Sequence, residues 1–219
     1  MANLKEIRNR ITSVGSTMQI TSAMKMVSAA KLKRAQDAIL QMRPYANKLT
    51  DLLVNLSSSL DSSEGGDFSS ERKQQNILFV AITSNRGLCG GFNANIIKKT
   101  LSIIDSNYSN KNIQIMSIGK KSSEYFNNNN FNVIGTHDEI YSDLTYENVS
   151  VISESIMNNY IEGKTDKVIL VYNQFKNAAT QNVMGENYLP VEAPEEQEGA
   201  IGDYIFEPQK QKIVKELIP

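Results

Sequence analysis

The first sixty residues place apolar side chains at a strict seven-residue interval, and no other feature of the sequence constrains the fold as much. With residues 4 and 7 taken as heptad positions a and d, fourteen of the seventeen such positions are apolar. The three exceptions are consecutive in the series: Thr21, Lys25 and Ser28. A repeat of this kind is typical of a helix that pairs with another helix along a narrow apolar seam.

A second apolar row crosses the interruption of this seam. Its members are Ile20, Ala23, Val27 and Ala30. The apolar side of the helix therefore turns away between residues 20 and 30 and then returns. This is the pattern expected of a helix whose face changes partner over that stretch.

The seam predicts one helix over about residues 3–56, which at 1.5 Å per residue would be roughly 80 Å long and would project from a small domain. Pro44 lacks a backbone donor. It predicts a kink rather than an end, because the heptad phase continues from Met42 to Ala46. Two ordinary amphipathic helices packed on a globular core are the alternative interpretation.

The rest of the chain has a different pattern. Residues 57–75 are rich in Ser and turn-forming residues and predict a flexible linker. Strands are then expected at 76–83, 112–119, 131–137 and 167–175, helices at 92–104, 122–128 and 147–163, and an added antiparallel strand within 180–191. This alternation predicts an α/β fold class, with a Rossmann-like layered domain over residues 76–206 and a mostly parallel sheet. Residues 207–219 are expected to begin a further helix.

Charge is distributed unevenly along the sequence. Residues 1–50 hold nine Lys or Arg against Glu6 and Asp37, a net charge of +7, so the remainder carries −8 of the total of −1. The first segment is therefore expected to meet an acidic protein sleeve, a nucleic acid or an anionic membrane surface. One cysteine and one histidine exclude an internal disulfide and a Cys-rich zinc site and argue against a histidine metal cluster. No apolar run is long enough to predict a membrane span.

The long seam has no mate within this sequence. The other helical patterns are short and are needed to cover the sheet. The helix therefore dimerises, or its mate lies in another chain, or the sequence stops before the mate begins. The chain ends at Pro219 where a helix is starting, so a truncation before a C-terminal helix is expected.

Three segments, in this order, resemble the gamma subunit of F-type ATP synthases. They are KEIRNRITSVGSTMQITSAMKMVSAAKLKRAQ (residues 5–36), SNRGLCGGFNANI (84–96) and DYIFEP (203–208). The resemblance implies a non-catalytic rotor subunit, the central stalk, that couples c-ring rotation driven by protons to conformational change at the catalytic beta subunits. It implies no cofactor, no metal and no catalytic residue in this chain. It also implies a peripheral membrane protein on the cytoplasmic side of a bacterial inner membrane.

The resemblance also implies partners. The N-terminal helix would pair with a C-terminal helix inside a hexamer of alpha and beta subunits, and the α/β domain would touch epsilon and the c ring. The rotor would be present as one copy and would not bind nucleic acid. Contacts with the alpha and beta sleeve are expected at Met24, Lys25, Met26, Val27, Lys31, Arg34, Arg86 and Cys89. Contacts with the c ring and epsilon are expected at Tyr204, Phe206 and Glu207.

Other functions stay open on the residues alone. The tract RGLCGG (86–91) lies between a strand and a helix, where a nucleotide-binding loop would lie, but its glycines lack the GxGxxG spacing. A dinucleotide-binding enzyme with a helical oligomerisation arm is therefore the alternative. Cys89 as a nucleophile would need a base, and His137 is the one candidate. A nucleic-acid adaptor that uses the basic helix is a third possibility, which the lack of interleaved aromatics disfavours.

Overall fold

The computed structural model describes residues 3–58, 68 and 72–191, with the side chains of 53–58 excepted. The chain divides into two compact units, residues 1–52 and 53–219. Most of the expected linker and the expected helix start at 207–219 lie outside the described residues.

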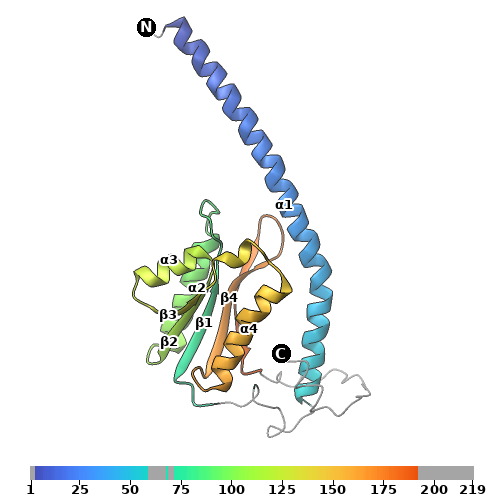
Figure 1. Ribbon diagram of the computed structural model, residues 1–219, viewed down its shortest axis with the longest axis vertical. Helices are drawn as coiled ribbons and strands as arrows, with labels where there is room; N and C mark the ends of the chain where they lie inside the picture. The colour runs from blue at the N-terminus through green and yellow to red at the C-terminus, as the bar shows by residue number, and fades with distance from the viewer. Residues whose placement is uncertain (1–2, 59–67, 69–71, 192–219) are drawn as a thin grey trace. The chain divides into compact units, whose positions relative to one another are not determined.

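One helix, α1 (Leu4–Ser58), makes up the first unit and runs on past its end (Figure 1). The side chain of Asn3 caps its start, because Oδ1 accepts a hydrogen bond from the Lys5 N–H at 3.2 Å. Pro44 lies inside the helix and does not end it, as predicted. The helix therefore runs two residues beyond the end expected at residue 56.

The second unit contains a five-stranded sheet with the order β3-β2-β1-β4-β5. The strands are β1 (Asn76–Ile82), β2 (Asn112–Ile118), β3 (Asn132–Thr136), β4 (Lys167–Phe175) and β5 (Gln181–Leu189). β1 pairs in parallel with both β2 and β4, and β2 pairs in parallel with β3. β5 is antiparallel to β4. The expected mostly parallel sheet with an added antiparallel strand is confirmed.

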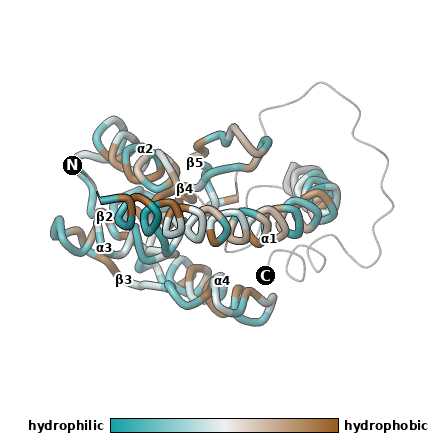
Figure 2. Tube along the Cα trace, turned by 90° about the horizontal axis from the view of Figure 1, so that it is seen from above, coloured by the Kyte–Doolittle hydropathy of each residue, from teal (hydrophilic) through white to brown (hydrophobic). Residues whose placement is uncertain are grey.

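Helices cover both faces of the sheet. They are α2 (Phe92–Asn107), α3 (Lys120–Asn128) and α4 (Tyr146–Ile161), with a short 3-10 helix, η1 (Glu139–Tyr141), between β3 and α4. Ile96 of α2 and Phe126 of α3 pack on one face, and Ile156 and Tyr160 of α4 pack on the other. Figure 2 shows α2 and α4 on opposite sides of the strands. The order β3-β2-β1-β4 and this layering are those of a Rossmann-like fold, as predicted.

Alternate residues of β1 supply both cores. Ile77, Phe79 and Ala81 face α2 and α3, whereas Leu78 and Val80 face α4. Successive side chains of a strand point to opposite faces of the sheet. A central strand that is covered on both faces therefore has a continuous run of apolar residues in its sequence. This is why NILFVAI was recognisable as a buried strand.

The turn after β2 brings two segments into close contact. Gly119 has φ of +105°, and a Cβ at this position would overlap the carbonyl oxygen of Thr83. The Thr83 N–H in turn donates to the Ile118 carbonyl at 2.8 Å. Only glycine fits both the backbone angle and the space here.

Gly119→Ala should lower the free energy of unfolding of the second unit by at least about 2 kcal/mol, because it adds backbone strain and a clash. Urea unfolding followed by circular dichroism measures this. Gly87→Ala is the matched control, since Gly87 has no atom within 4 Å of a built Cβ. Equal midpoints for the two variants would contradict the assignment.

Candidate functional site: two partner-contact surfaces

The loop after β1 lies where the strand order reverses. The chain leaves β1 for β2 on one side and returns to β4 on the other, so residues 83–91 emerge at the switch point between β1 and β4. In open α/β sheets this crevice, at the carboxyl ends of the strands, is the usual place for a functional site. The expected contact residues Arg86 and Cys89 belong to this loop.

Asn93, in the first turn of α2, holds one side of the loop. Its Oδ1 accepts from the Ser84 N–H at 2.9 Å, and its Nδ2 donates to the Arg86 carbonyl at 3.1 Å and to Cys89 Sγ at 3.2 Å. The side chain is 9% exposed. One buried amide therefore bonds to the loop backbone at Ser84 and Arg86 and to the side chain of Cys89.

Asn85 and Tyr141 hold the other side. Asn85 Nδ2 donates to the Asp138 carbonyl at 2.6 Å, and its Oδ1 accepts from the Lys120 N–H at 2.8 Å. The Tyr141 hydroxyl donates to the Thr83 carbonyl at 2.7 Å, and burial raises the pKa of this tyrosine. The base of the loop is thus bonded to the turn that follows β2, at Lys120, and to η1 and the residue before it, at Tyr141 and Asp138.

The tip of the loop projects into solvent from this base. Arg86, Leu88 and Cys89 are all exposed, and Leu88 has its side chain fully in solvent. Leu88 also has φ of +58°, and Gly90 has φ of +60°. A left-handed backbone is costly for leucine, so the fold holds an apolar side chain outward in a strained conformation. Such residues are typical of contact sites.

A cleft of about 410 Å³ lies beside the loop, between the start of α2 and the β4–β5 turn. It is lined by Cys89, Gly91, Phe92, Asn95, Asn173 and 178–181. None of these residues is charged. A dinucleotide site places the pyrophosphate at such a helix start, but the glycine spacing that shapes that site is not present. The cleft gives the nucleotide-binding alternative no support.

The second surface is on α1, where the seam is interrupted. Met24, Met26 and Val27 are 63%, 66% and 58% exposed. The seam residues before them, Leu4 to Met18, are exposed as well. The seam and its offset row therefore both present apolar side chains outward.

Basic residues lie beside this apolar stretch. Lys25, Lys31 and Arg34 are exposed and form no ion pair among the described residues, whereas Lys33 pairs with Asp37 at 2.8 Å. Three expected contact residues thus present unpaired positive charge. The remaining three, Tyr204, Phe206 and Glu207, lie outside the described residues.

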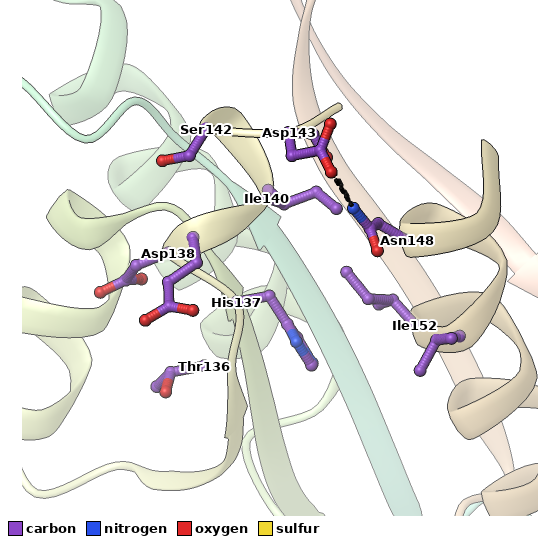
Figure 3. Close-up of a pocket in the computed structure, with 10 residues that line it drawn as sticks. Thr136, His137, Asp138, Ile140, Ser142, Asp143, Asn148 and Ile152 are labelled. Atoms are coloured by element: carbon purple, nitrogen blue, oxygen red, sulfur yellow. Dashed lines mark hydrogen bonds between the residues drawn. The ribbon is translucent and has the colours of Figure 1, made fainter. Parts of the chain in front are cut away.

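A second cavity has a volume of about 590 Å³ and was not expected from the sequence. It lies between the end of β3, η1 and the first turns of α4. Figure 3 shows His137, Ile140 and Ile152 directed into it, with Asp143 and Asn148 bonded at its rim. Burial lowers the pKa of His137, and the nearby charge of Asp138 partly opposes this.

Sequence reasoning missed several of these residues. Asn93 and Asn85 sit beside the recognised tract, and an Asn at a loop end is a known sign of side-chain bonding to the backbone. The cavity has no comparable signal, because it depends on how far apart α4 and β3 lie. Within the described ranges, no group of three or more His, Cys, Asp or Glu could hold a metal ion. Nor is any described helix long and apolar enough to cross a membrane.

The sequence has close relatives. A family model described as ATP synthase matches residues 3–219. The ATP synthase gamma chain of Christiangramia forsetii is 54% identical over 100% of this chain and 76% of that protein. Those of Flavobacterium johnsoniae and Chlorobaculum parvum are 55% and 41% identical, over 100% of this chain and 76% and 77% of theirs.

Solved structures share the fold. A chain from the central stalk and c ring of Tetrahymena thermophila mitochondrial ATP synthase matches with a TM-score of 0.60 and 20% identity, covering 91% of this chain and 85% of that one. A chain from the rotor of the Euglena gracilis enzyme gives a TM-score of 0.55 at 19% identity, covering 96% and 73%.

Asn93→Ala should lower the free energy of unfolding by about 2 kcal/mol, because it leaves loop donors and acceptors without partners. It should also speed tryptic cleavage after Arg86 several-fold while cleavage after Lys164 is unchanged. Asn95→Ala is the control. Asn95 lies in the same turn but is exposed, and its side chain makes no hydrogen bond to a described residue. Unchanged cleavage after Arg86 in Asn93→Ala would show that the loop is not held by this amide.

His137 should make stability depend on pH. Its folded pKa lies below the ordinary value of 6.5, so the unfolded chain takes up a proton first as the pH falls. Stability should therefore fall as the pH drops through and below about 6.5. His137→Gln should reduce this fall, measured as the change in urea midpoint between about pH 7.5 and 5.5. The sequence has one histidine, so an equal fall in both proteins would remove His137 as the cause.

Proposed function

Because this chain belongs to the ATP synthase gamma-chain family and is a rotor subunit of the F-type enzyme, we propose that it performs no chemistry itself and transmits torque. In this proposal, proton flow turns a c ring, the ring turns this chain, and the turning shaft changes the conformation of catalytic beta subunits. The observation that carries it is a helix of 55 residues whose apolar rows face outward.

A shaft of this kind acts through differential contact. Rotation presents a different side of α1 to each of several equivalent sites in turn, and each contact biases the conformational equilibrium of the site that it touches. The turn of the apolar face between residues 20 and 30 makes the sides of the helix unlike one another. That asymmetry is what a shaft needs in order to treat equivalent sites differently.

We assign the partners as follows. Met24, Lys25, Met26 and Val27 contact a catalytic beta subunit, with Lys31 and Arg34 facing acidic groups of the alpha and beta sleeve. Apolar side chains in this stretch favour burial, and the unpaired cations favour an acidic neighbour. Arg86 and Cys89 contact the sleeve from the rigid loop.

The other parts of the chain have assigned roles too. Residues 1–56 form the shaft, 57–75 a linker, 76–206 the α/β domain and 207–219 the start of a second shaft helix. Tyr204, Phe206 and Glu207 contact the c ring and epsilon. The protein lies at the membrane surface, on the cytoplasmic side, as one copy in each complex.

Met24→Lys should uncouple the motor. A lysine in this apolar stretch cannot be buried against a partner without losing its hydration, which costs several kcal/mol. In the purified ATP synthase carrying the variant, the number of protons pumped per ATP hydrolysed should fall well below that of the unmodified enzyme. The measurement uses inverted vesicles, with proton uptake and phosphate release followed together.

Gln19→Lys is the matched control. It adds the same charge five residues away, at a position that is already polar and is not an expected contact residue. It should leave the proton to ATP ratio unchanged. An unchanged proton to ATP ratio in Met24→Lys would contradict the assignment of this stretch as a contact with the beta subunit.

A further inference from the structure

The two faces of the sheet are covered unequally. α2 and α3 pack on one face, but α4 alone packs on the other. The strand β3, at the sheet edge, is left partly open on the α4 side, where Ile134 is 41% exposed. The cavity of about 590 Å³ begins at Thr136, the last residue of this strand, and extends along η1 to α4.

One segment of the second unit holds most of its exposed apolar side chains, and one of them, Val151, lines the cavity. Among the described residues of the second unit, the exposed large hydrophobic side chains are Leu88 and Ile161 together with six from one segment. The six are Ile134, Tyr141, Leu144, Tyr146, Val149 and Val151. Six such residues within 18 positions are more than scattered surface hydrophobics, and they mark a contact surface. We call the cavity and these six residues the η1–α4 surface.

The same segment is acidic throughout. Residues 131–163 contain six Asp or Glu and no Lys or Arg. Asp138, Glu139 and Asp143 line the cavity, and Glu147 is exposed in the first turn of α4. These four form no ion pair with any described residue. The charge is therefore left for a partner to neutralise.

We propose that the η1–α4 surface binds a basic amphipathic helix of another subunit of the ATP synthase, a proposal that rests on the rotor function above. Apolar side chains of that helix enter the cavity against Ile140 and Ile152, and its Lys or Arg residues lie beside Glu139 and Glu147. The acidic rim selects a basic partner and speeds its approach.

A helix fits this surface better than an added strand. A strand would bind through the backbone of an open sheet edge, but the cavity is walled by the side chains of Ile140, Val151 and Ile152. A helix presents apolar residues three and four apart on one side, with charged residues at the flanks. That arrangement matches an apolar hollow with a charged rim.

The test uses the assembled, purified ATP synthase with a photo-crosslinking amino acid at Val151. This residue lines the cavity and is exposed. Mass spectrometry of the crosslinked product should identify one peptide from another subunit, with a net positive charge and an amphipathic helical pattern. A peptide of this same chain, an acidic peptide, a lipid adduct or no product overturns the proposal.

Charge reversal provides the second readout. Glu139→Lys with Glu147→Lys should lower the crosslink yield at Val151 about tenfold at low salt. Neither carboxylate makes a side-chain hydrogen bond to a described residue, so the fold should tolerate both changes. Asp105→Lys, exposed on α2 across the sheet, should leave the yield unchanged. Unchanged yield in the double variant would reject the charge complementarity.

The proton to ATP ratio of the same complexes separates this proposal from the rotor function. A complex that pumps protons normally but gives no crosslink at Val151 refutes the η1–α4 surface and leaves the rotor intact. If the complex with the unmodified chain hydrolysed ATP without pumping protons, that result would instead count against the rotor function.

Discussion

The apolar rows of α1 are the constraint on which the rest of this account depends. Burying one Leu, Ile or Met side chain is worth about 1.5–3 kcal/mol, and α1 leaves many of them in water, among them Ile11, Met18 and Met24. An isolated helix gains little stability from its own backbone hydrogen bonds, because most helical stability in proteins comes from packing an apolar face against other surfaces. Its sequence is therefore understandable only if other protein surfaces cover it.

The α/β unit, unlike α1, buries most of its apolar side chains within itself. Each face of its sheet carries a buried apolar core, and a network of side-chain bonds ties the loop after β1 to α2 on one side and to the start of η1 on the other. The loop can therefore hold Leu88 outward in a left-handed conformation without collapsing. A contact that must bear force benefits from such a base, since a rigid loop loses little entropy on binding.

Much of the fold was predictable because its signals are local. The heptad phase predicted a helix through Pro44, and the apolar run of β1 predicted a strand buried on both faces. The antiparallel β5 was also expected. The short helix η1 and the start of α3 at Lys120 were not, because they depend on tertiary contacts such as the bond from Tyr141 to Thr83. The positions of Arg86 and Cys89 on an exposed loop agree with a contact role but do not test it.

Methionine oxidation in the assembled ATP synthase would test the central claim most directly. Met24 and Met26 lie on α1 and are exposed in the chain itself, whereas Met116 and Met157 are buried in the α/β unit. If α1 turns inside a sleeve, Met24 and Met26 should react with peroxide in the complex about as slowly as Met116 and Met157 do. Oxidation of Met24 and Met26 at the rate of the denatured chain would contradict this account, because it would leave the apolar face of the shaft in water.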